Sequence, residues 1–179
     1  QLDSKTPGHP EYGHTKGVEI TTGPLGQGIA NAVGFSMASK FVASQVNSET
    51  AKLIDLNVYC LCGDGDLEEG ISYEACSIAG HNKLDNLILI YDSNRITIEG
   101  STDISISEDI SKRFEAQGWD VLECDGHDFD DIDRALTQAK ANQKPTIIIA
   151  NTVIAKGAGK LEGSHHSHGA PLGEDVIAQ

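Results

Sequence analysis

The chain has 179 residues, 39% of them hydrophobic, which is enough to bury the core of one α/β domain. Its 27 Asp and Glu outnumber 13 Lys and Arg and give a formal net charge of −14, which argues against nucleic acid and anionic membranes as partners. There is no signal peptide and no apolar run near the roughly 18 residues of a membrane span, so we expect a soluble, cytoplasmic protein.

The first half of the chain predicts two helices and two strands. Residues 25–46 are rich in small and apolar side chains, a pattern typical of a helix that is buried on more than one side. Residues 57–62 and 87–91 are short, apolar, β-rich runs that predict buried parallel strands. Between them, residues 69–79 predict a helix that Gly80 terminates.

The second half continues this alternation. In chain order we expect a loop at 99–107, a helix at 108–117 that ends at Gly118, a strand at 120–124, a helix at 128–142, a strand at 146–154 and a glycine-rich loop at 156–173. Strands separated by helices of this length predict the α/β class, with one parallel sheet, right-handed crossovers and helices on both faces.

The four cysteines do not form a recognisable metal or disulfide motif. Cys60 and Cys62 lie two apart on one face of a predicted strand, and Cys76 and Cys124 have no partner at C-x-x-C spacing. We therefore interpret all four as buried free thiols.

Polar residues follow both strands of the first half. Asp64 lies in the turn Gly63-Asp64-Gly65, and Asn94 follows the second strand. Ligands of open α/β sheets bind outside the carboxyl ends of the strands, so both side chains are expected at one edge. A carboxylate, an amide oxygen and the carbonyl just after Asn94 are hard donors that suit Mg2+ or Ca2+. With glycines that admit an anion and a helix expected to start near Glu69, the pattern indicates a metal-diphosphate site, whereas the ordinary alternative is a tight turn.

The segment from Asp64 to Asn94 resembles the thiamine diphosphate fingerprint, GDG followed after about 26 residues by NN, with Ser93-Asn94 in place of the two asparagines. Three further blocks are similar to the transketolase form of this cofactor domain: TPGHPE at 6–11, GVEITTGPLGQG at 17–28 and HHSHGAPLG at 165–173. The blocks occur in the order of the transketolase family and span the chain. The resemblance implies the thiamine diphosphate-binding fold, in its diphosphate-binding domain.

The resemblance also implies a role for each matching residue. Asp64 and Asn94 would ligate Mg2+, or Ca2+ as its substitute, through their side chains, and Ile96 would do so through its carbonyl oxygen. Gly65 would donate its N–H to the diphosphate, and Ile98 would contact the thiazolium ring. The full set of implied cofactor contacts is Gly23, Pro24 and Leu25 along the aminopyrimidine, then Gly65, Asn94, Ile98 and His168.

Two histidines would act as catalytic residues near the reacting carbon, His9 and His168, with His165 close by. Imidazoles accept and donate protons near neutral pH and stabilise alkoxides as they form. An alternative is that the cluster His165, His166 and His168 binds Zn2+, although its spacing matches no structural zinc pattern. The histidines outside the motifs are interpreted as solvated: His14, His81 and His127.

The implied activity is that of a transketolase, which transfers a two-carbon ketol unit from a ketose phosphate to an aldose phosphate in the pentose phosphate pathway. Transketolases are homodimers with active sites across the interface, where Glu69 and the helix 69–79 are the expected contact. The carboxylate that activates the cofactor comes from a second domain, which no segment here matches, and an upstream histidine-bearing segment is also missing. We therefore expect 1–179 to be a single, partial diphosphate-binding domain, lacking the pyrimidine-binding and C-terminal domains and inactive alone.

Two alternatives stay open. One is another thiamine enzyme, such as a deoxyxylulose phosphate synthase or a phosphoketolase, although the blocks at 21–28 and 168–172 speak against it. The other is a non-catalytic or split-subunit thiamine diphosphate-binding module, which would share every cofactor residue. One departure from the family is Lys156, where transketolases usually have an aromatic residue, and its side chain faces either solvent or substrate.

Overall fold

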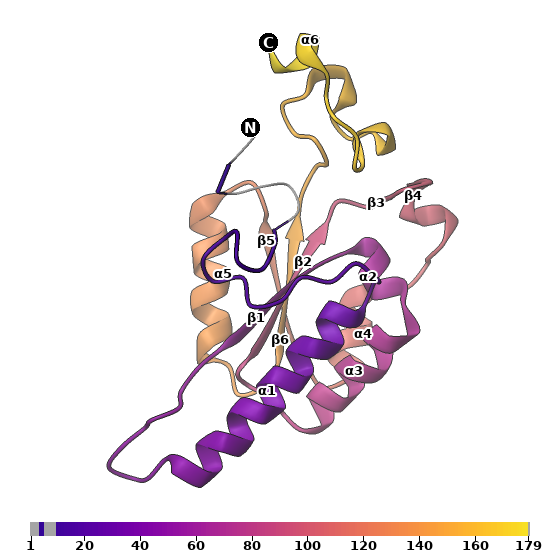
Figure 1. Cartoon of the computed structure of the whole chain (residues 1–179). Coiled ribbons are helices and arrows are strands. Elements are labelled where there is room, and N and C mark those ends of the chain that lie inside the picture. The colour runs from indigo at the N-terminus through magenta and orange to yellow at the C-terminus, as the bar shows by residue number, and fades with distance from the viewer. Residues whose placement is uncertain (1–3, 6–9, 179) are drawn as a thin grey trace.

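The computed structural model describes residues 4, 5 and 10–178. Its main sheet has four parallel strands in the spatial order β1 (Val58–Gly63), β2 (Leu87–Ser93), β6 (Thr146–Asn151) and β5 (Asp120–Asp125). All four carboxyl ends therefore lie at one edge of the sheet (Figure 1). The predicted α/β class with a parallel sheet is confirmed.

The other elements connect and cover these strands. The helices are α1 (Gln27–Val46), α2 (Asp64–Glu68), α3 (Gly70–His81), α4 (Ile110–Ala116), α5 (Phe129–Ala141) and α6 (Glu174–Ile177). A short antiparallel hairpin, β3 (Ile96–Thr97) and β4 (Gly100–Ser101), follows β2, and the 3-10 segments are η1 (Thr102–Ile104), η2 (Gly159–Leu161) and η3 (His165–Ser167). No helix in the described part of the chain is long and apolar enough to cross a membrane.

Helices cover both faces of the sheet, but unequally. One core cluster joins α1, α3 and α4 to the sheet and contains Leu87, Leu89 and Phe114. A second, smaller cluster lies under α5 and contains Ile88 and Ile148. Successive residues of β2 thus point to opposite cores, which explains why the central strands are continuous apolar runs in the sequence.

The cysteines lie in these cores. All four are free and buried, as predicted. Burial raises the pKa of Cys60 and of Cys76 to about 12, so neither thiol is ionised near neutral pH.

Two surfaces expected to be buried are exposed. On the edge strand β1 the inward residues Cys60 and Cys62 are covered, but Tyr59 and Leu61 are 49% and 72% exposed, because α5 contacts β5 and β6 and does not reach β1. Helix α1 is buried on one side only, and Phe41 on its other side is 68% exposed. The prediction that this helix is buried on more than one side is therefore wrong for the described chain, and β1, predicted as a buried strand, is covered on one face only.

The helix predicted at 69–79 is α3, and a second helix, α2, lies directly before it where a turn was expected. Helix α2 begins at Asp64 itself, because the carboxylate of Asp66 accepts the N–H of Gly63, the residue before the helix, at 2.9 Å. The backbone is extended at Glu69, and α3 then starts at Gly70. The turn at 63–65 is therefore itself the start of a helix, although the sequence predicted a helix start only near residue 69.

Gly80 does not terminate α3, which continues to His81. A Cβ at Gly80 would lie 1.8 Å from the carbonyl oxygen of Gln117, so glycine is required where α3 meets the end of α4. The same contact is reinforced by Trp119, whose indole N–H donates to the carbonyl of Cys76 at 2.8 Å. Gly118, with φ 88, ends the α4 segment as predicted.

Other boundaries differ by a few residues. Strand β6 ends at Asn151, before the predicted residue 154, because the N–H of Val153 donates to the imidazole of His127 instead of to a strand. The stretch 99–107, predicted as a loop, contains β4 and η1. Both are local: β4 pairs with β3 a few residues before it, and the hydroxyl of Ser101 caps η1 by accepting the N–H of Asp103.

We predict that Gly80→Ala lowers the free energy of unfolding by about 2 kcal/mol or more, because the added methyl group must push α3 away from α4. The matched control is Gly34→Ala in α1, where no atom lies within 4 Å of the added Cβ. There, alanine should stabilise the helix by up to about 1 kcal/mol. Urea unfolding followed by circular dichroism measures both, and equal effects would contradict the packing argument.

Candidate functional site

The structure brings the two predicted strand-tip residues together. Strands β1 and β2 pair in register, with Gly63 opposite Asp92, so Asp64 and Asn94 both lie just past the strand ends. The carboxylate of Asp64 accepts the backbone N–H of Arg95, the residue after Asn94, at 3.1 Å. One hydrogen bond thus ties the first turn to the second.

Asp64 is a buried carboxylate with few partners. It is only 6% exposed, and its Oδ1 accepts the hydroxyl of Tyr91 at 2.6 Å. Burial raises the pKa of Asp64 above its ordinary value, while the hydrogen bonds from Tyr91 and Arg95 oppose this rise. In the described residues no Lys or Arg forms an ion pair with it.

The raised pKa has a consequence for metal binding. The folded chain holds the Asp64 proton more tightly than the unfolded chain does, so this group makes stability fall as pH rises from the ordinary pKa through the folded one. A cation bound to the carboxylate would offset the cost of burying its charge. A buried carboxylate without a counter-ion therefore fits a divalent metal.

Asn94 forms a tight turn that redirects the chain. Its side-chain oxygen accepts the N–H of Ile96 at 2.9 Å, and Arg95 between them has a left-handed φ of 61. An amide oxygen has two lone pairs, so Asn94 can keep this bond and still ligate a metal. The turn leads into β3, which starts at Ile96, and Ile98 stands beyond it, 68% exposed.

The predicted aminopyrimidine segment, residues 23–25, lies against the turn that contains Asp64 and Gly65. Gly23 and Pro24 are exposed, and Leu25 is 50% exposed just before α1. A Cβ on Gly65 would lie 3.3 Å from Cδ1 of Leu25, so the two segments are in contact. Residues far apart in the sequence therefore form one continuous surface above the sheet edge.

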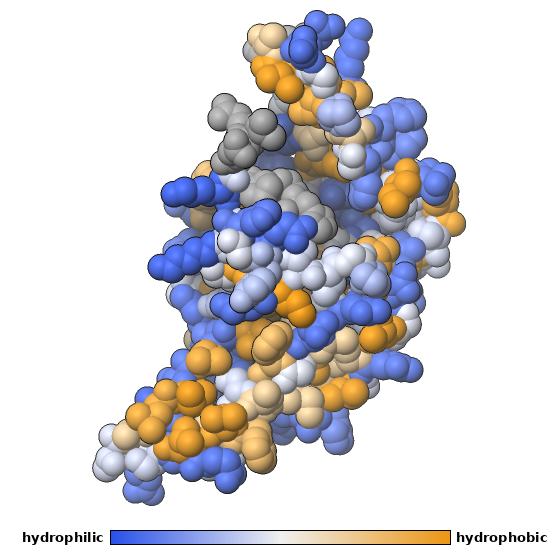
Figure 2. All heavy atoms as spheres, in the orientation of Figure 1, coloured by the Kyte–Doolittle hydropathy of each residue, from blue (hydrophilic) through white to orange (hydrophobic). Residues whose placement is uncertain are grey.

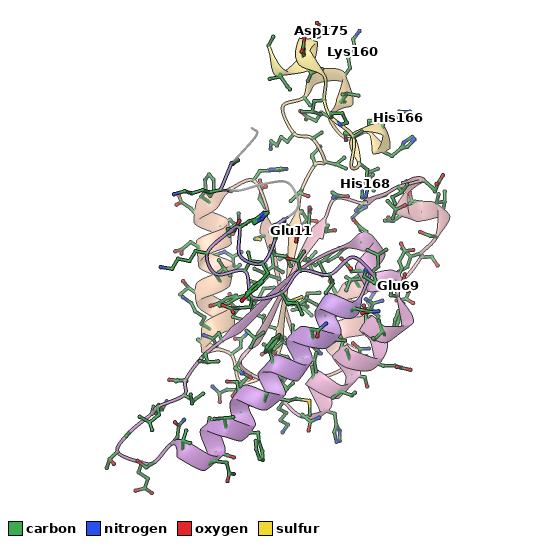
Figure 3. All side chains as sticks on the ribbon, in the orientation of Figure 1. Glu11, Glu69, Lys160, His166, His168 and Asp175 are labelled. Carbon is green, nitrogen blue, oxygen red and sulfur yellow. The ribbon has the colours of Figure 1, made fainter. Side chains whose placement is uncertain are left out.

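The predicted histidines are only partly placed. His9 lies outside the described residues. His168 follows η3 and is exposed. Its backbone N–H donates to the carbonyl of His165 at 3.0 Å. Within the described chain, the imidazole of His168 forms no hydrogen bond with the strand tips. Figure 3 shows it on the part of its loop nearest the sheet, with Lys160 and Asp175 beyond it.

Comparison with known proteins decides the family. The model of the family described as "Transketolase, thiamine diphosphate binding domain" matches residues 1–179. The chain belongs to the transketolase family. The matched domain is the part that binds thiamine diphosphate, as the sequence motifs implied.

Individual transketolases are similar over the whole chain. The transketolase of Staphylococcus epidermidis is 54% identical to this chain. The match covers 99% of this chain and 27% of the length of that transketolase. A solved transketolase from Campylobacter jejuni is 64% identical with a TM-score of 0.88, and one from Pichia stipitis in complex with sedoheptulose-7-phosphate is 44% identical with a TM-score of 0.89. Both structural matches cover 99% of this chain. The chain in turn spans 27% of the Campylobacter jejuni protein and 26% of the Pichia stipitis protein.

The zinc alternative has no support in the geometry. The rings of His165 and His166 lie 4.1 Å apart, centroid to centroid. However, no three His, Cys, Asp or Glu side chains in the described part of this transketolase domain are placed to hold a metal ion. The candidate site at Asp64 is of another kind, with one carboxylate, one amide and one backbone carbonyl.

Sequence reasoning passed over two residues near the site. His127, which we interpreted as solvated, also accepts the N–H of Val153 through Nε2 at 2.8 Å, where the chain leaves β6 for the histidine loop. Asp66 accepts two backbone N–H groups from different segments. Position at the carboxyl edge of the sheet is the one signal that flags both. Lys156, for which two orientations were open, is exposed at the surface.

A pocket of about 410 Å³ opens beside Asp64, between α2 and residues 102–111. Its lining includes Asp64 itself, Ser93 and Arg95, but not Gly65, Asn94 or Ile98. The pocket therefore lies beside the candidate cofactor surface. Several carboxylates line it, which makes it unsuited to a diphosphate.

We predict that Tyr91→Phe lowers the free energy of unfolding by about 2 kcal/mol, because it removes a buried partner of the Asp64 carboxylate. The matched control is Tyr73→Phe, which removes an exposed hydroxyl bond to Glu108 and should cost less than about 1 kcal/mol. Thermal and urea unfolding without metal measures both variants. A cost at Tyr73 equal to that at Tyr91 would argue against the buried-carboxylate account.

Proposed function

We propose that this chain is the diphosphate-binding part of a transketolase, and that the complete enzyme transfers a two-carbon ketol unit from a ketose phosphate to an aldose phosphate. The observation that supports this most is the hydrogen bond joining Asp64 to the turn after Asn94, at adjacent strand tips. We further propose that Mg2+ binds there, with Ca2+ as a substitute, because the donors are all hard oxygens.

Each protein group has a defined task in this proposal. Asp64, Asn94 and the carbonyl of Ile96 hold the metal, which neutralises the diphosphate. The N–H of Gly65, in the first turn of α2, donates to the same anion. A chain with a net charge of −14 needs such local positive potential to bind an anionic cofactor.

The apolar groups orient the rings. Gly23, Pro24 and Leu25 lie along the aminopyrimidine, and the exposed Ile98 contacts the thiazolium ring. Thiamine diphosphate, when bound, supplies the electron sink for cleavage of the carbon–carbon bond. His9 and His168 hold and move protons near the reacting carbon, and His168 also contacts the diphosphate.

The substrates are proposed to be sugar phosphates. The similar transketolase from Pichia stipitis has been solved in complex with sedoheptulose-7-phosphate, a ketose phosphate. A role in the pentose phosphate pathway and a cytoplasmic location agree with this assignment and stay predictions. The expectation of one partial domain over 1–179 also stays a prediction.

We propose that the complete enzyme is a homodimer, and the apolar face of α1 supports this. A groove of about 480 Å³ on this face is lined by Gln27, Ala30, Asn31, Gly34, Phe35, Ala38 and Ile71. Figure 2 shows further hydrophobic side chains toward the far end of α1. In the last turns of this helix, Phe41 and Val42 are exposed. Glu69, the expected interface residue, is exposed between α2 and α3 (Figure 3). Apolar patches of this kind mark protein interfaces.

We predict that Asn94→Ala weakens Mg2+-dependent binding of thiamine diphosphate at least about tenfold, because the metal loses a ligand. The control is Asn151→Ala, which removes an asparagine from the tip of β6 and should change affinity less than twofold. Calorimetry of the 179-residue chain with Mg2+, Ca2+ or EDTA measures this. We expect micromolar or weaker binding by the unaltered chain, so submicromolar affinity, or binding unaffected by EDTA, would contradict the proposal.

A further test concerns turnover. We predict that the 179-residue polypeptide, mixed with a ketose phosphate, an aldose phosphate, thiamine diphosphate and Mg2+, transfers no ketol unit. The reason is that transketolases take the carboxylate that activates the cofactor from a second domain. Product sugars are measured by chromatography. Robust transfer would show that these residues alone form a complete site.

A further inference from the structure

The carboxylate of Asp66 joins two segments that are far apart in the sequence. Its Oδ1 accepts the N–H of Gly26 and its Oδ2 accepts the N–H of Gly63, each at 2.9 Å. Gly63 is three residues before Asp66, whereas Gly26 is 40 residues before it. Both oxygens are therefore engaged by backbone groups, and one side chain connects the entry of α1 to the entry of α2.

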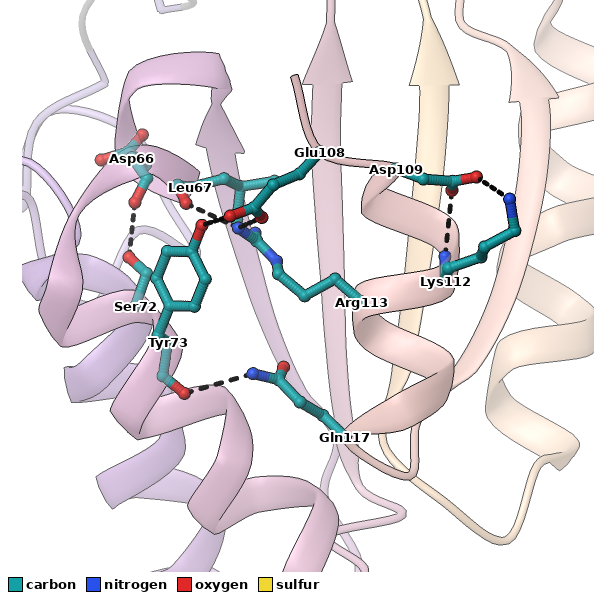
Figure 4. Close-up of polar contacts among 9 residues, drawn as sticks. All are labelled: Asp66, Leu67, Ser72, Tyr73, Glu108, Asp109, Lys112, Arg113 and Gln117. Carbon is teal, nitrogen blue, oxygen red and sulfur yellow. Dashed lines mark hydrogen bonds and ion pairs between the residues drawn. The ribbon is translucent and has the colours of Figure 1, made fainter. Parts of the chain in front are cut away.

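The backbone of Asp66 is itself fixed. Its carbonyl oxygen accepts the hydroxyl of Ser72 at 2.5 Å, a contact drawn in Figure 4. Ser72 is 1% exposed and lies in the first turn of α3, so the bond is largely shielded from solvent on the Ser72 side. The backbone of Asp66 is thus held by Ser72, and the side chain of Asp66 in turn fixes the positions of the two N–H groups that it binds.

The backbone of Gly26 lies so close to the start of α3 that there is no room for a side chain. Its φ is 77, and a Cβ there would lie 2.7 Å from Oγ of Ser72 and 2.9 Å from the side chains of Glu69 and Ile71. The backbone of the α1 entry is therefore pressed directly against the α2 and α3 turn. The bond from Gly26 to Asp66 is the polar part of this close approach.

The two joined segments are the ones that the proposed function assigns to opposite ends of the cofactor. Gly26 directly follows Leu25, in the aminopyrimidine segment, and Gly63 directly precedes Asp64, in the metal turn. A ligand that contacts both segments binds more tightly when their separation is already set, because less conformational entropy is lost on binding.

We propose that Asp66 is a positioning residue that sets the separation between the aminopyrimidine segment and the metal turn. The inference rests on the proposed function of those two segments. It assigns Asp66 no contact with metal or cofactor, since both of its oxygens are committed to backbone N–H groups. Its effect is on ligands that span the two segments, more than on ligands that reach the metal turn alone.

The test compares two ligands of the 179-residue chain in Mg2+: thiamine diphosphate, which spans both segments, and inorganic pyrophosphate, which reaches only the metal turn. For Asp66→Ala we expect affinity for thiamine diphosphate to fall about tenfold and affinity for pyrophosphate about threefold. Asp66→Asn, which keeps one acceptor, should fall between Asp66→Ala and the unaltered chain. It also provides a second variant if the alanine variant does not fold.

Asp128→Ala is the matched control. Asp128 also accepts two backbone N–H groups, those of Asp130 and Asp131, but both belong to its own helix α5 on the opposite face of the sheet. This variant should lose a similar amount of stability in thermal unfolding and change either affinity less than twofold.

The outcomes separate the two proposals. Equal losses for thiamine diphosphate and pyrophosphate in the Asp66 variants, or losses no larger than those of Asp128→Ala, would overturn the positioning role and leave the proposed function standing. Failure of the unaltered chain to bind either ligand would overturn the proposed function, and the positioning role with it.

Discussion

The structure depends on one buried carboxylate at the edge of a parallel sheet. Asp64 leaves β1 and enters α2 with both oxygens held, one by the hydroxyl of Tyr91 on the neighbouring strand and one by the N–H of Arg95 in the next turn. Removing this charge from water is costly, and within the described residues the donors that oppose that cost are all neutral. The divalent cation and diphosphate that we propose would offset this cost, because the cation would neutralise the carboxylate.

Rigid packing around this carboxylate gives it a defined position. Asp66 holds two glycine N–H groups, Ser72 holds the backbone of Asp66, and Gly80 lets α3 lie directly on the end of α4. Figure 4 shows Arg113 continuing this network, with its guanidinium donating to the carbonyl of Leu67 in α2 and to Glu108. The entry of α2 is thus supported from three directions, and a site whose groups are held before binding loses less entropy when a ligand arrives.

The covering of the sheet is uneven, and this has a functional meaning. Three helices pack on one face, whereas α5 alone packs on the other and leaves Leu61 exposed. Helix α1 presents Phe35 and Phe41 outward beside a groove. The 179-residue chain spans 27% of the length of the transketolase of Staphylococcus epidermidis. This exposed apolar surface supports the homodimer that we propose.

The alternation of strands and helices, the free cysteines and the placement of Asp64 and Asn94 at one edge of the sheet were all predictable from the sequence, because they follow from local periodicity and from the rule that parallel strands end at one edge. The tie from Asp66 to Gly26 and the bond from His127 to Val153 were decided only by the tertiary structure. Each depends on a backbone N–H supplied by a segment brought close through packing, and no local pattern records which distant donor a side chain will meet. The exposed sides of β1 and α1 could not be predicted from the sequence either. An apolar residue in the sequence does not show whether another element of the chain packs on it.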